Sequence, residues 1–105
     1  MAFPSALPYV SWSSVTFAEI PAESWEAVYG SMQALKAHVQ EYPGCEGFDL
    51  FVRAEGDEVL VHCYTTWDLQ EQLDAFLEGG YTFERFLDDV QGIVPDLTLA
   101  MEKIF

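Results

Sequence analysis

CEGFDLFVR at residues 45–53 and EVLVHCYTT at residues 58–66 are two strand-like runs, separated by the residues AEGD. Both runs are rich in β-branched and aromatic residues, and the connection contains glycine, which predicts a β-hairpin. A turn centred on Glu55-Gly56 would set the register. The pairs on one face are then Phe48 with Cys63, Leu50 with Val61 and Val52 with Val59, and on the other face Asp49 with His62, Phe51 with Leu60 and Arg53 with Glu58. One face of the hairpin is therefore apolar and the other is mixed.

The segments around this hairpin supply further strands and a helix. Residues 9–17 predict a first strand, which Ile20-Pro21 ends, and residues 97–105 predict the last strand. Apolar residues at steps of three and four predict a helix between Pro21 and Tyr42-Pro43-Gly44. Its apolar stripe consists of Trp25, Val28, Met32, Leu35 and Val39.

Two more helices are predicted after Trp67. Asp68 is a suitable N-cap, and Glu71 three residues later would complete a capping box. The apolar stripe of this helix is Leu69, Leu73, Phe76 and Leu77, and Gly79-Gly80 ends it. Thr82 is expected to cap a third, short helix that stops at Gly92 and carries Phe83, Phe86, Leu87 and Val90.

The resulting order is β-α-β-β-α-(α)-β in a chain of 105 residues. It predicts one α+β, ferredoxin-like domain over residues 9–105, with a four-stranded antiparallel sheet covered by helices on one face. Residues 1–8 are expected to form a loose N-terminal arm. The uncovered face is too apolar to remain in water, so a homodimer through the two sheet faces is expected. Its predicted contact residues are Phe51, Leu60, His62 and Tyr64.

The charge balance restricts the partners. Eighteen acidic and four basic residues give a net charge of −14 at pH 7, which excludes nucleic acid and argues against anionic membranes. No run is long and apolar enough to span a membrane, and the first residues lack signal-peptide features, so a cytoplasmic location is expected. Cys45 and Cys63 have no metal-ligand spacing, and the register keeps them apart, so neither a metal site nor a disulfide is predicted.

Three segments carry a resemblance to a known family. The loop Tyr42-Pro43-Gly44, the strand end Tyr64-Thr65-Thr66-Trp67 and the segment Tyr81-Thr82-Phe83-Glu84-Arg85-Phe86 resemble the antibiotic biosynthesis monooxygenase family, together with the order of elements. The resemblance runs from about Val10 to Phe105. It implies a dimeric α+β barrel with a pocket between sheet and helices in each subunit, and Trp67 on the pocket wall.

Members of that family include oxygenases that oxidise quinols or polycyclic phenols without metal or flavin, and others that degrade haem. Haem-degrading relatives carry a histidine ligand on the helix after the tryptophan, whereas residues 82–92 contain no histidine. Cofactor-free relatives place a polar residue, often Asn, near the position of Cys63. No cofactor is therefore predicted, and Cys63 weakens the likeness to the quinol oxygenases.

The resemblance and the residue chemistry together give a set of candidate site residues. Trp67 and Arg85 are the catalytic candidates, and the substrate-binding candidates are Cys63, Phe76, Tyr81 and Phe86. Arg85 could stabilise a phenolate in a dry pocket. Each also has a structural interpretation: core packing for Trp67 and Cys63, an ion pair with Asp88 for Arg85, and filling of the pocket for the aromatic rings.

Two functions that use a pocket remain open from the sequence, beside a purely structural dimer module without a pocket. One is a cofactor-independent monooxygenase that oxidises a quinol or another electron-rich aromatic with O2, where the substrate supplies the electrons. The other is a small-ligand-binding protein of the same fold without catalysis. A further pair, His62 with Asp49, could act as an oriented base or as a polar contact in the dimer interface.

Overall fold

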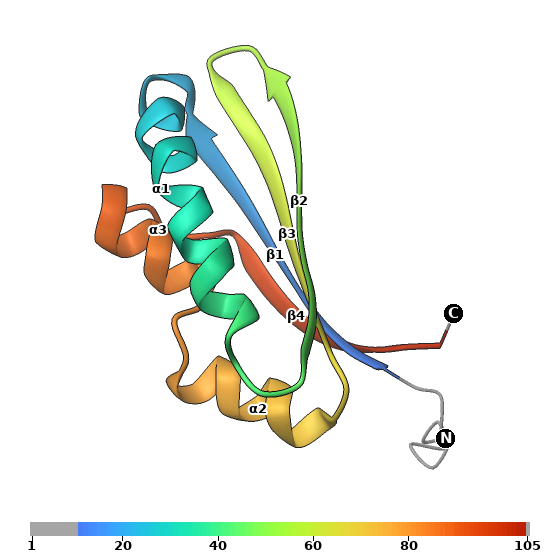
Figure 1. Ribbon diagram of the computed structural model, residues 1–105. Coiled ribbons are helices and arrows are strands. Elements are labelled where there is room, and N and C mark those ends of the chain that lie inside the picture. The colour runs from blue at the N-terminus through green and yellow to red at the C-terminus, as the bar shows by residue number, and fades with distance from the viewer. Residues whose placement is uncertain (1–10, 105) are drawn as a thin grey trace.

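The computed structural model describes residues 11–104, which form one sheet with three helices on one of its faces (Figure 1). The elements in chain order are β1 (Ser11–Pro21), α1 (Ala22–Gln40), β2 (Cys45–Glu55), β3 (Glu58–Trp67), α2 (Gln70–Gly79), α3 (Phe83–Gln91) and β4 (Leu97–Lys103). The strand order is β2-β3-β1-β4, and every neighbouring pair is antiparallel. This is the predicted ferredoxin-like α+β arrangement. The expected arm at residues 1–8 lies outside the described residues.

The predicted hairpin is present, but its register was wrong. Phe51 lies opposite His62 and Asp49 opposite Tyr64, so the β2–β3 pairing is displaced by two residues from the predicted one. The reason is the turn, which consists of Gly56-Asp57 between the paired residues Glu55 and Glu58. Gly56 has φ of 60° and no other residue of the turn has a positive φ, which is the pattern of a type II′ turn. A displacement of two keeps every side chain on its predicted face.

Helix α2 begins one residue later than predicted. The N–H of Asp68 donates to the carbonyl of Gly44 at 3.0 Å, which holds Asp68 in the extended connection instead of at the cap. Leu69 is the N-cap, and its N–H donates to Oε1 of Gln72 at 3.0 Å. Leu69 is consequently 45% exposed and does not belong to the buried stripe. The cap of α3 is as predicted, since Thr82 Oγ1 accepts from the N–H of Arg85 at 3.3 Å.

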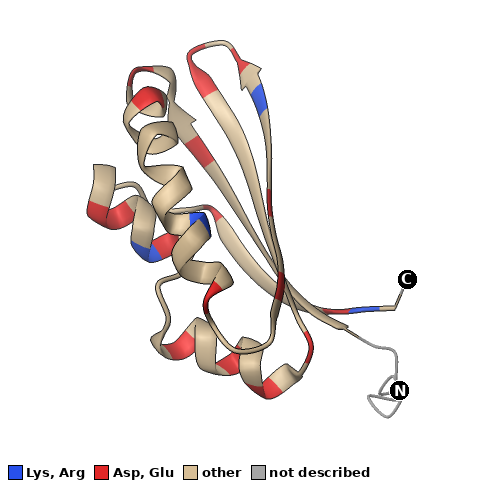
Figure 2. Cartoon of the chain, in the orientation of Figure 1, with Lys and Arg blue, Asp and Glu red and all other residues tan. Residues whose placement is uncertain are grey.

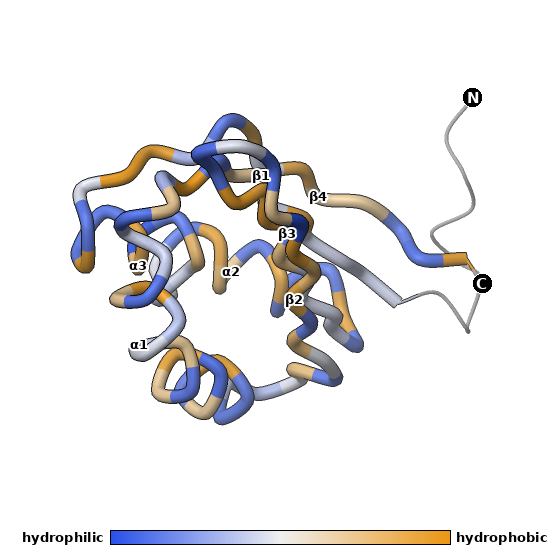
Figure 3. Tube along the Cα trace, turned by 90° about the horizontal axis from the view of Figure 1, so that it is seen from above, coloured by the Kyte–Doolittle hydropathy of each residue, from blue (hydrophilic) through white to orange (hydrophobic). Residues whose placement is uncertain are grey.

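The core lies between the sheet and the helices. The predicted α1 stripe is buried at Val28, Met32, Leu35 and Val39. It faces Val59, Val61 and Cys63 of β3, whose side chains point to the helix side. Hydrophobic and hydrophilic residues alternate around the turns of α1, as the colouring of Figure 3 shows. Burial of this one apolar stripe holds α1 on the sheet.

The opposite sheet face carries no helix (Figure 1). It exposes large apolar side chains. Phe51 is 61% exposed, and Leu97, Leu99 and Met101 of β4 are between 40% and 49% exposed. We call this surface the open face. None of the described helices is long and apolar enough to cross a membrane.

The turn at Gly56 provides a test of the register. Gly56→Ala should lower the free energy of unfolding by about 1 kcal/mol, because alanine is strained at positive φ although nothing lies within 4 Å of its Cβ. The matched control is Gly30→Ala in α1, which also meets nothing and should stabilise by up to about 1 kcal/mol. Urea denaturation of both variants measures the difference. Equal effects at the two positions would contradict the turn geometry.

Candidate functional site

Trp67, the last residue of β3, is fixed by a buried hydrogen-bond chain. Its side chain is 1% exposed, and its Nε1–H donates to Oγ1 of Thr65 at 2.8 Å. Thr65 Oγ1 in turn shares a hydrogen bond with Oγ of Ser14 on the neighbouring strand. A buried indole N–H without an acceptor would cost about 1–3 kcal/mol, so this chain determines how the ring lies.

Three aromatic rings meet where β3, α2 and the loop after α1 converge. The ring centroids of Trp67 and Phe76 lie 4.8 Å apart at an interplanar angle of 35°. Tyr42 lies edge-on to both, 5.2 Å from Phe76 and 6.3 Å from Trp67. These distances are within the range of favourable aromatic pairs. We call the three residues the aromatic cluster.

A mainly apolar hollow of about 260 Å³ lies beside the aromatic cluster. Its lining residues are Tyr42, Pro43, Trp67, Glu71, Gln72, Ala75, Phe76, Gly79 and Gly80. Small-molecule sites typically have volumes from about 300 Å³ upward, so the hollow lies just below that range and has room for no more than one small molecule. Because Trp67 and Phe76 are almost fully buried, a ligand here would contact mainly Tyr42, Pro43 and the exposed side of α2.

The loop motif Tyr42-Pro43-Gly44 has a local structural reason. Gly44 has φ of 84°, and a Cβ at this position would overlap the side chain of Gln72. The positive φ is the reason that glycine is favoured here, since the overlapping atoms are the flexible end of the Gln72 side chain. The same close approach places Tyr42 against Phe76.

Tyr42 was missed as a site residue, although the sequence motif contained it. Its hydroxyl accepts a hydrogen bond from the N–H of Tyr81 at 3.1 Å and lies 3.4 Å from Nε2 of His38. The His38 ring is also 6.0 Å from the ring of Tyr81. The spacing of His38 and Tyr42, one helical turn apart, was the only signal for this contact. Through these contacts Tyr42 joins His38 of α1 to Tyr81, which precedes α3.

Arg85 has a different environment from that of Trp67. Its guanidinium donates to the carbonyls at the C-terminus of α2: to Gly80, to Glu78 at 2.8 Å and to Leu77 at 3.4 Å. These carbonyls lack helical partners, and a cation near them is favoured by the helix dipole. Arg85 lines a separate hollow of about 220 Å³ with Thr82 and other residues. The alternative ion pair with Asp88 is absent from the described residues, where the one salt bridge is Arg53–Glu55.

Tyr81 and Phe86 lie on the α3 side of the aromatic cluster. The Tyr81 hydroxyl donates to Oδ2 of Asp89 at 2.8 Å, and partial burial together with this carboxylate raises the pKa of Tyr81 above its usual value. Phe86 is 3% exposed, and its ring lies 6.4 Å from that of Tyr81. Neither residue lines the hollow beside Trp67.

Cys63 is buried on the helix side of the sheet, at 2% exposure. Burial first, and the nearby Asp49 carboxylate second, raise the pKa of its thiol to about 12. The thiol is therefore protonated at neutral pH and is no nucleophile there. The two cysteines are unpaired, and the described residues contain no group of three or more His, Cys, Asp or Glu placed to hold a metal ion.

The predicted pair of His62 with Asp49 was wrong, because the register differs. His62 lies between Phe51 on β2 and Phe17 on β1, and its ring centroid is 4.5 Å from that of Phe17. Asp49 faces Tyr64 instead. The pair of Arg53 with Glu58 is likewise replaced, since Arg53 lies opposite Leu60 and contacts Glu55 at 3.5 Å.

The contacts of Arg85 give a test of its structural role. Arg85→Ala should lower the free energy of unfolding by about 1 kcal/mol, since three carbonyls at the end of α2 lose their donor. Arg53→Ala is the matched control, because its ion pair is exposed and should contribute less than about 0.5 kcal/mol. Thermal and urea unfolding measure both. If Arg85→Ala were as mild as Arg53→Ala, the capping role would be refuted.

Comparison with known proteins shows the fold. No family model and no curated protein sequence matches the chain. Among solved structures, a Nitrosomonas europaea protein assigned to the antibiotic biosynthesis monooxygenases aligns over 98% of this chain and 93% of its own, with a TM-score of 0.66 and 16% identity. A heme-degrading protein from Mycobacterium tuberculosis aligns over 90% of this chain and 95% of its own, with a TM-score of 0.61 and 19% identity.

A further solved structure, described as an antibiotic biosynthesis monooxygenase, aligns over 91% of this chain and 97% of its own. Its TM-score is 0.61 and its identity 18%. At such identities the likeness concerns the backbone arrangement. The chain therefore has the fold that antibiotic biosynthesis monooxygenases have, along nearly its whole length.

Proposed function

We propose that this chain is a cofactor-independent monooxygenase that binds a quinol or another electron-rich aromatic molecule in the hollow beside Trp67 and oxidises it with O2. The observation that carries the proposal is the apolar hollow of about 260 Å³ next to the aromatic cluster. A flat aromatic ring matches its size and lining. The fold is shared with solved structures named as monooxygenases, which supports the same chemistry.

The reaction needs no electron source other than the substrate. A phenol that has lost its proton transfers electrons to O2, and one oxygen atom bonds to the ring carbon that carried hydrogen. The O–O bond then breaks, the ring carbon becomes a carbonyl, and the second oxygen leaves as water. The substrate loses four electrons and O2 accepts four, so the quinone and water balance the reaction. The protein has to bind the ring, favour the phenolate and limit access of water.

The polar groups around the hollow are suited to the first step. The Glu71 carboxylate can accept the proton of a substrate hydroxyl, and the amide of Gln72 can donate to the phenolate oxygen. Gln72 is held in place because its Oε1 already accepts from the N–H of Leu69. Tyr42, Pro43 and the exposed side of α2 would contact the ring. In this proposal Arg85, Tyr81, Phe86 and Cys63 support the site from the surrounding structure.

The alternative is a binding protein of the same fold without catalysis. This alternative is favoured because the strongest hydrogen-bond donors near the hollow are already bonded to other groups of the protein. The indole N–H of Trp67 is bonded to Thr65, and the guanidinium of Arg85 is bonded to the end of α2. Under this alternative the hollow binds an aromatic molecule, and no oxygen is consumed.

We also propose that the protein is a homodimer in which two open faces pack together. Phe51, Leu60, His62 and Tyr64 of the predicted contact set all lie on this face, with Phe51 and Tyr64 rings 5.7 Å apart and perpendicular. Leu97, Leu99 and Met101 of β4 extend the apolar area. Stacking two sheets at about 10 Å would remove these side chains from water.

The hollow can be blocked without disturbing the core. Ala75 is exposed and lines the hollow, so Ala75→Phe should fill it and weaken binding of a quinol or naphthol at least tenfold. Ala27→Phe on the exposed side of α1 is the matched control and should leave binding unchanged. Binding is followed by tryptophan fluorescence, and turnover by oxygen uptake over a panel of quinols with metal-stripped protein.

The two readouts separate the functions. Oxygen uptake by wild type and Ala27→Phe, lost in Ala75→Phe, supports the monooxygenase. Binding that Ala75→Phe abolishes, without oxygen uptake on any quinol of the panel, supports the binding protein. If Ala75→Phe and Ala27→Phe bind alike, the hollow is not the site.

A further inference from the structure

A chain of hydrogen bonds runs along one side of the hollow beside the aromatic cluster. The guanidinium of Arg85 donates to the carbonyl of Gly80. The N–H of the same peptide group, which belongs to Tyr81, donates to the hydroxyl oxygen of Tyr42 at 3.1 Å. That hydroxyl lies 3.4 Å from Nε2 of His38. We call these linked groups, from the guanidinium to the imidazole, the relay.

The relay meets the hollow at Tyr42. Tyr42 and Gly80 both line the hollow, and the Tyr42 hydroxyl is bonded to the N–H that directly follows Gly80. The hydroxyl therefore lies on the Gly80 side of the hollow, where the hydroxyl of a bound aromatic molecule can approach it. His38 is exposed, so its ring can exchange protons with water. The relay thus leads from the hollow to the solvent.

The donors fix the direction of the relay when the hollow is empty. A backbone N–H can only donate, so the Tyr42 oxygen accepts from Tyr81 and keeps its own proton free to donate. Nε2 of His38 is the acceptor next to it. A neutral imidazole that accepts at Nε2 carries its proton on Nδ1. The second lone pair of the Tyr42 oxygen can then accept a hydrogen bond from a ligand hydroxyl.

We propose that Tyr42 takes up the proton of a substrate hydroxyl in this hollow while its own proton passes to Nε2 of His38, and that Arg85 supports the transfer through the peptide group between it and Tyr42. This inference rests on the proposed function and names the group that ionises the substrate. Tyr42 touches the substrate, whereas His38 and Arg85 act through Tyr42. The exposed carboxylate of Glu71 is the competing proton acceptor.

Each proton has a defined origin and destination. The substrate O–H bond breaks and its proton bonds to the Tyr42 oxygen, while the Tyr42 O–H bond breaks and that proton bonds to Nε2 of His38. The proton on Nδ1 then leaves to water, so the imidazole is neutral again. Nε2–H now donates to the Tyr42 oxygen, and the Tyr42 O–H donates to the phenolate. The substrate loses one proton, water gains it, and no electron moves in this step.

The charges around the hollow explain why a phenolate needs this support. The side chains of α2 and α3 that carry charge are mostly acidic (Figure 2), and Arg85 is the one base in the sequence of these two helices. Nearby carboxylates disfavour a further anion. Arg85 polarises the peptide group whose N–H donates to Tyr42. A donor on the Tyr42 oxygen makes the Tyr42 O–H a stronger donor to the phenolate.

The groups that face His38 favour arrival of the proton. The ring of Tyr81 lies 6.0 Å from the imidazole, and the Tyr81 hydroxyl donates to Oδ2 of Asp89. Because that hydroxyl is bonded to Asp89, it does not compete with Tyr42 for Nε2. On α1, Glu41 follows His38 by one turn, and its N–H donates to the His38 carbonyl at 3.2 Å. Both carboxylates favour a positive charge on the imidazole.

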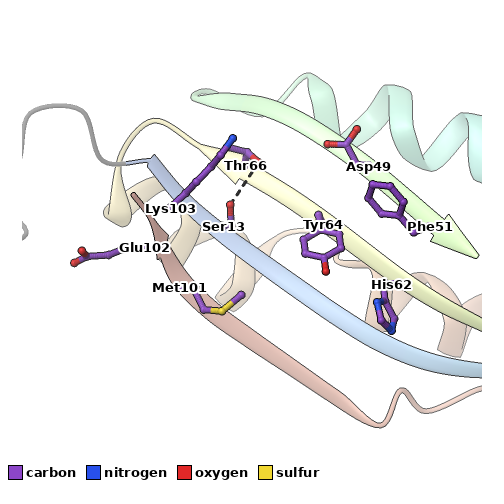
Figure 4. A pocket seen from close by; sticks show the side chains of 9 residues that line it. All are labelled: Ser13, Asp49, Phe51, His62, Tyr64, Thr66, Met101, Glu102 and Lys103. Carbon is purple, nitrogen blue, oxygen red and sulfur yellow. Dashed lines mark hydrogen bonds between the residues drawn. The ribbon is translucent and has the colours of Figure 1, made fainter. Parts of the chain in front are cut away.

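The chain has two histidines, and the second is an internal reference. His62 lies on the open face, where it lines a separate hollow of about 580 Å³ with Tyr64 and Met101 (Figure 4). Its ring packs edge-on against Phe17 at a centroid distance of 4.5 Å. A ligand beside the aromatic cluster should therefore change the signals of His38 and leave those of His62 unchanged.

Long-range ¹H–¹⁵N correlation spectra show which nitrogen of each imidazole carries a proton. The probe is 4-nitrophenol, studied at about pH 8, where imidazole is mostly neutral. We expect Nε2 of His38 to be unprotonated in the free protein and protonated when the probe is bound. Tyr42→Phe should abolish this change, and the matched control Tyr29→Phe, at an exposed position of α1, should preserve it.

The visible absorbance of the phenolate gives a second readout on the same probe. Removing the Tyr42 hydroxyl should raise the pH at which bound 4-nitrophenol is half ionised by about one unit, since a hydrogen bond to the anion is lost. His38→Ala leaves Tyr42 in place and should raise this midpoint in the same direction, which keeps the test valid if Tyr42→Phe does not fold. An unchanged midpoint in His38→Ala would overturn the proton transfer to His38.

The same titration tests the contribution of Arg85. Arg85→Gln keeps a donor for the Gly80 carbonyl but removes the charge, so it should raise the midpoint of the bound probe, whereas Arg85→Lys should keep it close to wild type. Arg53→Gln is the matched control, because it removes the same charge from an exposed pair with Glu55. Equal midpoints in Arg85→Gln and Arg53→Gln would overturn the part assigned to Arg85.

The outcomes separate the relay from the function on which it rests. If 4-nitrophenol quenches tryptophan fluorescence but His38 keeps its proton on Nδ1, the relay is refuted, the hollow remains the site, and Glu71 is the acceptor. Changes at His62 alone would place the probe on the open face and refute both. Absence of binding would also refute both. A proton transfer to His38 without oxygen uptake on any quinol supports the relay and refutes the monooxygenase.

Discussion

The structure depends on the hydrogen bond from the indole of Trp67 to Thr65. Trp67 ends β3, one of the two inner strands of the sheet, and its buried ring leaves no unpaired N–H because Thr65 accepts it at 2.8 Å. With the ring fixed, Phe76 packs on it at 4.8 Å and holds α2 against the end of the sheet. Tyr42 closes the group from the loop after α1. One satisfied donor thus determines where two helices meet the sheet.

This constraint also decides where a ligand can bind. A buried Trp67 fills the space between sheet and helices, so the hollow beside it opens outward, between the Tyr42-Pro43-Gly44 loop and α2. The resemblance implied a pocket beside Trp67, and the chemistry of Arg85 suggested that it could stabilise a phenolate there. Arg85 instead holds the C-terminus of α2 and so stabilises one side of the hollow from outside. Shape and apolar lining, rather than a cation, therefore provide the binding energy in the proposed function.

The sequence could predict every element that depends on local pattern. The α1 stripe, the Thr82 cap and the alternation of β3 are periodic or adjacent signals, and all three are present. The contacts that were missed join residues far apart in the chain. The hydrogen bond from Asp68 to Gly44 moved the start of α2, and the hydrogen bond from Tyr81 holds Tyr42, which lines the hollow. The hairpin register failed for a smaller reason, since the turn is centred on Gly56-Asp57, one residue later than the assumed centre at Glu55-Gly56.

A titration with 2-naphthol, followed in ¹⁵N–¹H correlation spectra, tests most directly whether the aromatic cluster forms a ligand site. We predict that amide shifts concentrate at Gly44, Ala75, Gly79 and Gly80, while the indole N–H of Trp67 stays protected from exchange because Thr65 retains it. Shifts that concentrate on the open face, around Tyr64 and Met101, would contradict the account, as would an indole N–H that exchanges rapidly with solvent.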